Sequence, residues 1–444
     1  MKRKTIGVLL AGVICAISVA PAGAVHVTDI AGLGALAAAT AAADVLGSGD
    51  VNAAPPVQDA QSIGFRGLEE TVRAHNQTIQ AFRKTLQGIE NTDLDGQFFA
   101  EELQYQAQLN EYQSQANAYT TYIKELKALD GDSSDPTIAA QIEMAESLLK
   151  VAQNGVAQIN GIISGLDDAQ EAAEDELDDT YASTEKQLEN TANGIVVGAQ
   201  TAYAGIITIR EGIETLDRSL AALDRNIAVV EKQVEIGMAS QLTLENLEQT
   251  RRTAAAQRET LVKQQTATEN QLSLLCGNTA NTTVKPTTLP TVTDRQLADM
   301  NYEEDLEAAL DNSYTIWSAR DEMRKASNDY EDNVTSTVDA YEAAKLNLEY
   351  AEESVTNSFR QLYLDVQDKK RLLDEAQAAY DMEKKNFDVD ALRYERGMIS
   401  KNDYLTAQDD LAAQEDAVRT AEHDLFTAYN TYDWAKRGYI GSAA

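Results

Sequence analysis

Few residues of this chain have the types and spacing that catalysis or metal binding requires. The histidines His26, His75 and His423 are far apart, and none has a second histidine four residues away, as helical metal sites do. Cys276 precedes a glycine and has no nearby histidine to activate its thiol, so we expect a buried cysteine. The acidic run Glu174–Asp179 lacks the central glycine of a calcium loop and is typical of a solvated helix face. We therefore expect no catalytic residues, no enzyme activity, no metal and no cofactor.

Two short segments of matching type are more distinctive. One reads Gly237-Met238-Ala239-Ser240 and the other Gly397-Met398-Ile399-Ser400. In each, the glycine can adopt the left-handed conformation that ends a helix, and the serine can cap the helix that follows. Each segment is therefore predicted to be the turn at the tip of an antiparallel helical hairpin. The methionine would then be an exposed apolar group at the end of that hairpin, where a monomer has little use for one.

Long helices with heptad seams are expected to support these turns. Apolar residues in steps of three and four predict a coiled-coil seam before the first turn, formed by Ala199, Ala202, Ile206, Ile209, Ile213, Leu216, Leu220, Leu223, Ile227, Val230 and Val234. After the second turn, large residues alternate with alanines, at Tyr404, Ala407, Leu411, Val418, Ala421, Leu425, Ala428, Tyr432 and Ala435. A rougher seam crosses 359–394 and is interrupted by Lys369 and Glu383. At about 1.5 Å per residue, each helix should be roughly 50–60 Å long.

Composition supports an elongated helical protein and excludes some partners. Among 444 residues, 72 are Asp or Glu and 37 are Lys or Arg, which gives a formal net charge of −35. A chain this acidic is expected to bind nucleic acids poorly, because phosphate binding requires Lys and Arg. Only 6 prolines occur, which leaves room for long uninterrupted helices.

The N-terminus is predicted to be a cleaved secretory signal peptide. Residues 1–24 contain the basic start Lys2-Arg3-Lys4, an apolar stretch and a small-x-small site ending at Ala24. A membrane anchor is the alternative, but it requires about 20 apolar residues. The remaining chain is divided into a flexible segment 25–61, a first repeat 62–277 with a helical insert at about 90–195, a Thr/Pro linker 278–301 and a second repeat 302–440.

These features resemble the TolC-like outer-membrane efflux protein family. The second repeat carries the resemblance best, in Tyr394-Glu395-Arg396-Gly397-Met398-Ile399-Ser400-Lys401-Asn402-Asp403-Tyr404-Leu405. The first repeat offers Gly237-Met238-Ala239-Ser240 and ends in Leu272-Ser273-Leu274-Leu275-Cys276-Gly277, similar to the family's Leu-rich repeat ending. The expected fold is all-α, with long antiparallel coiled-coil hairpins in two tandem repeats.

The resemblance implies an exported homotrimer of the cell envelope, at the outer membrane and periplasm. Three copies would form a helical barrel that works with a periplasmic adaptor (a membrane fusion protein) and an inner-membrane transporter. The adaptor-facing residues would be Gly237, Met238, Ser240, Gly397, Met398 and Ser400. Asp403 matches an acidic position near the family's pore constriction, while Thr406 replaces a frequent second acid.

One departure from the family keeps a second function open. Family members cross the outer membrane with strands of about 9–11 residues, inserted between the helices of each repeat. No such strands are recognisable here, because 312–363 and the insert at about 90–195 both have helical patterns. The alternative to an efflux or secretion duct is therefore a non-channel envelope or surface coiled-coil protein derived from that family. A secreted hydrolase is a third hypothesis, but no catalytic constellation supports it.

Overall fold

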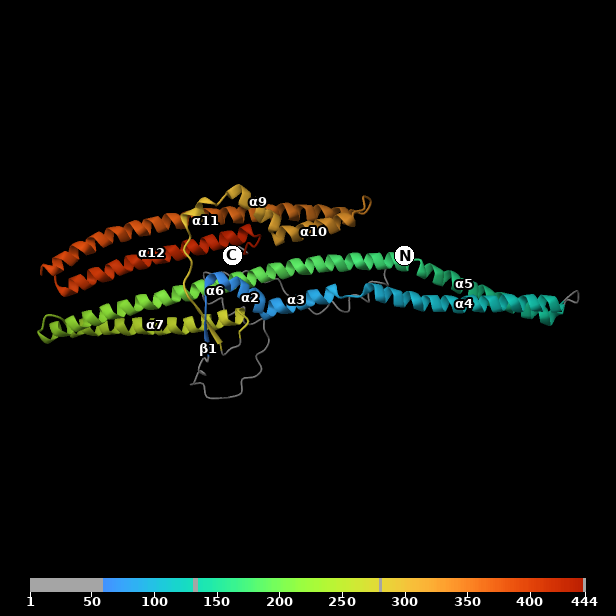
Figure 1. Ribbon diagram of the computed structural model, residues 1–444, viewed down its shortest axis with the longest axis horizontal. Helices are drawn as coiled ribbons and strands as arrows, with labels where there is room; N and C mark the ends of the chain where they lie inside the picture. Colours follow the sequence, from blue (N-terminus) through green and yellow to red (C-terminus); the bar gives the residue numbers. More distant parts are fainter. Residues whose placement is uncertain (1–58, 131–134, 279–281, 442–444) are drawn as a thin grey trace, which may run out of the picture. The chain divides into compact units, whose positions relative to one another are not determined.

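The computed structural model describes residues 59–130, 135–278 and 282–441. The expected signal peptide 1–24 and most of the expected flexible segment 25–61 lie outside these residues. The chain divides into two units, one formed by 78–189 and the other by 1–77 with 190–444. The described residues are almost entirely helical, which confirms the expected all-α fold class with antiparallel hairpins (Figure 1).

The larger unit contains both predicted tips. Its elements are β1 (Asp59–Ile63), α2 (Phe65–His75), α7 (Gln241–Leu275), β2 (Thr282–Pro286), α8 (Asp294–Ala298), α9 (Tyr302–Asn312), α10 (Tyr314–Asn328), α11 (Thr335–Glu395) and α12 (Lys401–Lys436). The smaller unit contains α3 (Gln77–Glu90), α4 (Leu94–Asp130) and α5 (Pro136–Ile163). The helix α6 (Leu166–Glu235) begins in the smaller unit and ends in the larger one. Two turns join α6 to α7 and α11 to α12 (Figure 1).

Two helices are much longer than the sequence predicts. α6 has 70 residues and α11 has 61, which correspond to about 105 Å and about 92 Å of helix. The estimate of roughly 50–60 Å from the sequence was too short for these two helices. A polar residue in a seam does not end a helix when its side chain pairs with a side chain of the neighbouring helix. Lys369 interrupts the seam of α11, yet its Nζ atom lies 3.1 Å from the carboxylate of Asp424 on α12. α7 and α12, with 35 and 36 residues, agree with the estimate.

The predicted seams form the packed interior of the hairpins. In α6, Ala199 and Ile206 are fully buried and Ile213 nearly so. In α12, the buried residues include Leu425 and Tyr432. Within 136–235, one helical window is long and apolar enough to cross a membrane, by length and composition only, and 44% of it is buried within the protein.

A two-stranded parallel sheet, which the sequence analysis did not identify, lies beside α6. β1 pairs with β2, with Ile63 opposite Pro286. The buried Tyr203 of α6 is anchored next to this pair, because the N–H group of Thr287 donates to its Oη atom at 3.0 Å. The carbonyl oxygen of Thr288 lies 3.1 Å from the same Oη atom. The linker 278–301 is therefore partly a strand.

Two glycines, each near the end of one of the predicted repeats, pack against a carbonyl group in the same way. Gly277 has φ 76° and Gly438 has φ 89°. A Cβ atom on Gly277 would lie 2.1 Å from the carbonyl oxygen of His75, where α2 ends. A Cβ atom on Gly438 would lie 2.2 Å from that of Asn312, where α9 ends. Both sites require glycine for its backbone conformation and for its size.

A buried carboxylate joins α9 to α12. Asp305 is 4% exposed and interacts with the hydroxyl of Tyr432, the ammonium of Lys436 and the N–H group of Asn301. Burial alone would raise the pKa of Asp305, but the hydrogen bonds from Lys436 and Tyr432 outweigh it and lower the pKa below the ordinary range. The ionised form therefore stabilises the folded chain.

We predict that Asp305→Asn destabilises the chain by about 2 kcal/mol at neutral pH, because a charged acceptor is lost while its donors remain. The pKa is lower in the folded state, so the carboxylate contributes stability above its unfolded pKa and loses it as the pH falls through the folded pKa. Urea unfolding at neutral and at acidic pH measures both effects. The exposed Asp299→Asn serves as the control. An equal loss at both pH values would contradict the role of the charge.

Candidate docking site at the hairpin tips

The two tips have nearly identical backbone geometry. Gly237 and Gly397 have φ values of 76° and 69°, in the left-handed region where the sequence places them. At each tip, the methionine N–H donates to the carbonyl group five residues earlier, at 2.7 Å in the first and 2.8 Å in the second. Each glycine N–H also donates to the carbonyl group three residues earlier, at 3.0 Å and 2.9 Å, and together these bonds form the glycine-dependent end of a helix. The predicted turns are therefore correct at both positions.

The serine of each tip caps the helix that follows. Ser240 Oγ accepts from the backbone N–H of Thr243 at 3.1 Å, and Ser400 Oγ accepts from that of Asp403 at 3.2 Å. In the second tip, Asp403 also accepts from the backbone N–H and the hydroxyl of Ser400, at 3.0 Å and 2.8 Å. These hydrogen bonds hold the pKa of Asp403 below its ordinary value. The structure thus places Asp403 in an exposed capping box at the start of α12.

The methionines are among the most exposed apolar side chains of the described residues. Met238 is 76% exposed and Met398 is 71% exposed. Beside Met238, the side chains of Ile236 and Leu242 are exposed by 68% and 65%. A shift of 160 residues puts Arg396 and Asn402 at the matching positions of the second tip. The first tip is therefore the more apolar of the two.

The second tip is instead supported by aromatic rings. Tyr394 stacks on Tyr404 with ring centroids 4.7 Å apart and an interplanar angle of 14°. At the first tip, the residues 160 positions before Tyr394 and Tyr404 are Val234 and Leu244, which are not aromatic. The two tips therefore share their turn and cap but differ in the side chains behind them.

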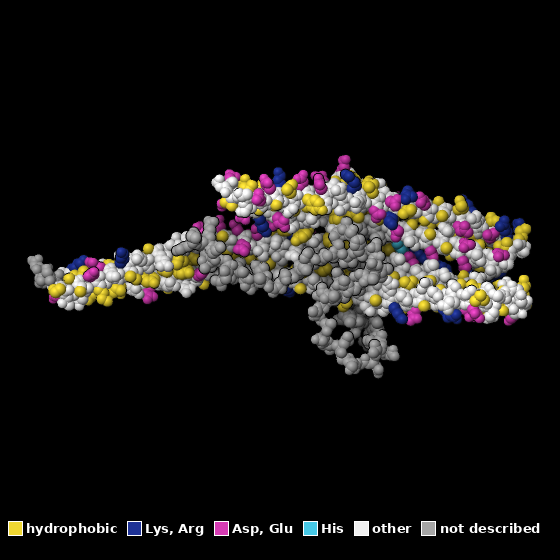
Figure 2. All heavy atoms as spheres, turned by 180° about the vertical axis from the view of Figure 1, so that it is seen from behind, with side chains coloured by type: hydrophobic (Ala, Val, Ile, Leu, Met, Phe, Trp, Pro, Cys, Tyr) yellow, Lys and Arg dark blue, Asp and Glu magenta, His cyan; other side chains and the backbone are white. Residues whose placement is uncertain are grey.

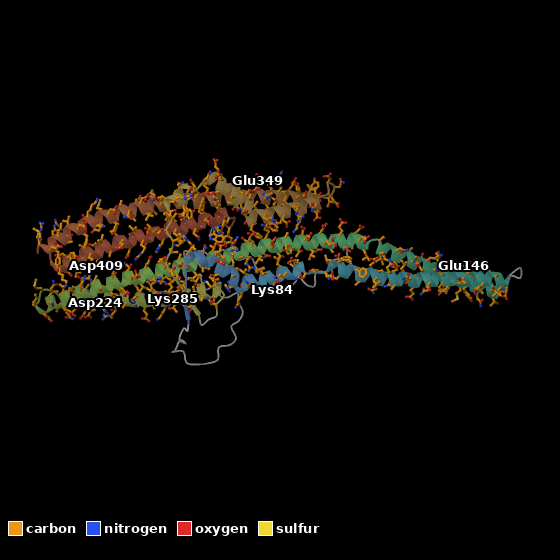
Figure 3. All side chains as sticks on the ribbon, viewed as in Figure 1. Lys84, Glu146, Asp224, Lys285, Glu349 and Asp409 are labelled. Atoms are coloured by element: carbon orange, nitrogen blue, oxygen red, sulfur yellow. The ribbon has the colours of Figure 1, made fainter. Side chains whose placement is uncertain are left out.

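Arginine–aspartate pairs link the two hairpins near the tips. Arg218 and Arg225 of α6, one heptad apart, pair with Asp416 and Asp409 of α12. Asp409 is labelled in Figure 3. Both pairs are partly buried and lie one heptad apart on each helix, an arrangement that suits a role in setting the register between the two hairpins.

A second pair of ion pairs lies within the first hairpin. Asp217 and Asp224 of α6 interact with Arg258 and Arg251 of α7, again one heptad apart (Figure 3). The hydrogen bonds from these arginines lower the pKa of both carboxyl groups. The sequence analysis did not identify either set. Charges that recur every seven residues beside a seam are the signal that could have found them.

The other candidate residues do not form a reaction centre. Cys276 is 2% exposed, and burial raises the pKa of its thiol to about 11, so it is protonated at neutral pH. No three metal-ligating side chains lie together in the part of the chain that the structure describes. A shallow cavity of about 310 Å³ between α11 and α12 is lined by Gln377, Tyr380, Glu415, Val418, Arg419 and Glu422.

Comparison with known proteins shows what this fold is similar to. No family model matches the sequence, and no curated protein matches it. Among solved structures, a membrane protein from Pseudomonas aeruginosa aligns over 86% of this chain and 91% of its own, with 13% identity and a TM-score of 0.50. Two further similar structures have lower TM-scores of 0.45. The outer membrane protein VceC of Vibrio cholerae covers 62% of this chain and 76% of its own at 14% identity, and the outer-membrane channel OprN covers 84% and 90% at 12% identity.

The resemblance that the sequence analysis stated is therefore confirmed at the level of the fold. The chain shares an arrangement of long helical hairpins with the membrane protein from Pseudomonas aeruginosa, whose TM-score reaches 0.50.

Proposed function

We propose that three copies of this chain form a helical duct of the cell envelope, at the outer membrane and periplasm. The duct conducts substrates for efflux or secretion, together with a periplasmic adaptor and an inner-membrane transporter. The long helical hairpins, an arrangement shared with a membrane protein from Pseudomonas aeruginosa, support this proposal, as does the resemblance of the two tip segments to the TolC-like family. The residues proposed to face the adaptor are Gly237, Met238, Ser240, Gly397, Met398 and Ser400.

The observation that carries the proposal is the pair of matching tips. Met238 and Met398 occupy equivalent turns and are both more than two-thirds exposed. Three copies would present six such groups, and a ring of exposed apolar side chains is a surface for another protein. Gly277 and Gly438 support the proposed repeats 62–277 and 302–440, because each closes its repeat against a helix end in the same way.

A line of exposed apolar residues along α11 supports the homotrimer. One face of α11 is buried within the chain, at Ala344, Ala351, Val355, Phe359 and Val366. Another line is exposed and consists of Leu346, Tyr350, Leu364, Met382 and Val389. These residues are separated by nearly whole numbers of 3.6-residue turns, so they lie along one side of the helix. Charged residues such as Glu353, Arg371 and Glu375 lie between them on the same side, so the line offers a series of separate apolar contacts to a neighbouring copy.

Asp403 is proposed to lie near the narrowest part of the duct. Its lowered pKa keeps it ionised at neutral pH, so three copies would place three negative charges at one level. Thr406 follows one helical turn later and adds no charge. The proposed constriction therefore carries a single acidic ring.

The alternative remains a non-channel coiled-coil protein of the envelope. It is favoured by one observation, namely that the insert between the first-repeat helices folds as the helices α4 and α5 instead of strands. Such a protein would have no need of exposed apolar tips.

The test is the accumulation of a fluorescent efflux substrate in native cells that lack the protein. A duct predicts that the dye accumulates, that the wild-type chain restores export, and that a chain with Met238→Asp and Met398→Asp does not. Unchanged accumulation together with an altered envelope morphology would favour the structural alternative.

A further inference from the structure

The helix α5 has very few charges for this protein. Charged residues make up 25% of the chain, yet in the 28 residues of α5 only Glu143, Glu146 and Lys150 are charged. At 100° per residue, these three lie within one narrow sector of the helix. The rest of its circumference is uncharged.

Two adjacent heptad seams run along this uncharged part. The first packs on α4 and includes Ala145, Ala152 and Ile159, which are buried. The second seam is displaced by one residue and again alternates steps of four and three, at Thr137, Gln141, Met144, Leu148, Val151, Gly155, Gln158 and Ile162. Most of its side chains are exposed, including Met144 at 67% and Val151 at 61%. A helix with two seams has the pattern of one that packs on two neighbours.

The exposed seam belongs to one face of the α4–α5 hairpin. The ammonium of Lys127 on α4 lies 2.8 Å from the carboxylate of Glu146 on α5, and this ion pair marks the charged face. On α4, helical geometry puts Tyr122 and Leu129, which are exposed, on the opposite side of the seam from Lys127. The opposite face therefore combines the second seam of α5 with a row of α4 formed by Gln104, Gln108, Glu111, Gln115, Ala118, Tyr122, Glu125 and Leu129. We call these two rows the uncharged face, although Glu111 and Glu125 are two exceptions, both on α4.

Figure 2 shows the same imbalance on the arm formed by α4 and α5, where hydrophobic side chains gather and charged ones are few. The surfaces of α11 and α12 carry many more acidic and basic side chains in that view.

We infer that the uncharged face packs on the α4–α5 hairpin of a neighbouring copy of this chain. Each copy carries a net charge of −35, so the surfaces of two copies generally repel one another when they meet. This face carries few charges, so two copies can approach there with less of that cost. Glutamines such as Gln141 and Gln158 also favour another helix over lipid, because an amide in hydrocarbon would lack hydrogen-bond partners.

The size of the face shows how it would act. The 28 residues of α5 extend over about 42 Å, and a helix is about 10 Å wide, which gives about 400 Å² per copy for α5 and at most about twice that with the row of α4. A standard interface buries about 800 Å² per partner. The contact therefore reaches at most the size of a standard interface, and the inference rests on the homotrimer of the proposed function, which would already hold the copies side by side.

Photo-crosslinking in the full-length chain tests this contact. Benzoyl-phenylalanine replaces Leu148 on the uncharged face in one variant and Lys150 on the charged face in the matched control. A third variant carries it at Leu364, in the exposed line of α11. We expect the probe at Leu148 to link to α4 or α5 of another copy, as peptide mass spectrometry would identify, while the control at Lys150 gives no such link.

The outcomes separate this inference from the proposed function. Links between copies at Leu364 without links at Leu148 overturn the inference and leave the trimer in place. A link from Leu148 to lipid also overturns it. Links at Leu148 without links at Leu364 support the inference but contradict the trimer contact along α11. An absence of links at both positions overturns both.

A charge placed in the same face provides a second measurement. Leu148→Glu should weaken self-association by about tenfold, since a carboxylate would be placed in a contact that otherwise has few charges. Leu148→Gln is the matched control and should change it little. Sedimentation of both full-length variants over a range of concentrations gives the ratio. Equal association of the two variants would overturn the inference.

Discussion

Replacing Met238 and Met398 together by aspartate is expected to abolish adaptor binding and export while the helices remain intact. Hot-spot contacts contribute about 1–2 kcal/mol or more each, and three copies multiply the loss. Of the two single changes, Met238→Asp should weaken adaptor binding more than Met398→Asp, because Ile236 and Leu242 extend the apolar surface of the first tip. The measurement is the affinity for the cognate adaptor, with circular dichroism and a thermal melt for each variant.

The matched control is Leu274→Asp, which introduces the same charge at an exposed apolar residue near the other end of α7. It should leave adaptor affinity unchanged. If both tip variants fold normally and keep full affinity and export, the tips are not the docking site and the structural alternative gains support.

Gly277→Ala and Gly438→Ala are expected to destabilise the chain by about 3 kcal/mol or more each. A left-handed conformation costs an alanine about 1–2 kcal/mol, and overpacking adds about 1–3 kcal/mol. The added Cβ atoms would meet backbone carbonyl oxygens at 2.1 Å and 2.2 Å, which cannot rotate away as a side chain could. Urea unfolding, followed by helicity, measures the loss.

The tips provide the control for this second prediction. Gly237 has the same φ value as Gly277, 76°, but nothing lies within 4 Å of its would-be Cβ atom. Gly237→Ala should therefore lose only the conformational part, about 1–2 kcal/mol. Equal losses for Gly237→Ala and Gly277→Ala would show that the close approach to His75 has no energetic role.

The sequence is sufficient to predict features that depend on neighbouring residues. The turns at Gly237 and Gly397, together with the caps from Ser240 and Ser400, follow from residues within a few positions of one another. The seams follow from a repeat that is visible in any short window, as Ile206 and Leu425 illustrate. The type of fold and the candidate tips could therefore be predicted.

Features that depend on distant residues could not be predicted in the same way. The strand β1 is five residues long, and its pairing with β2 joins residues more than 220 positions apart in the chain, such as Asp59 and Thr282. The ion pair of Arg218 with Asp416 joins residues 198 positions apart. The close approach at Gly277 likewise depends on where α2 ends in space, at His75. The exposure of Ile236 and Leu242, which makes the first tip more apolar, became evident only from the packing around it.

The most direct test of the proposed trimeric duct is the number and spacing of the tips in one particle. A spin label on Asn402→Cys, exposed in the first turn of α12, can be read by double electron–electron resonance in the purified full-length protein. The buried Cys276 should remain unlabelled, and Cys15→Ser removes the other cysteine of the chain. We expect a modulation depth for three coupled spins and one main distance, as threefold symmetry requires. A signal without dipolar modulation, or a depth for two spins, would contradict the trimeric duct.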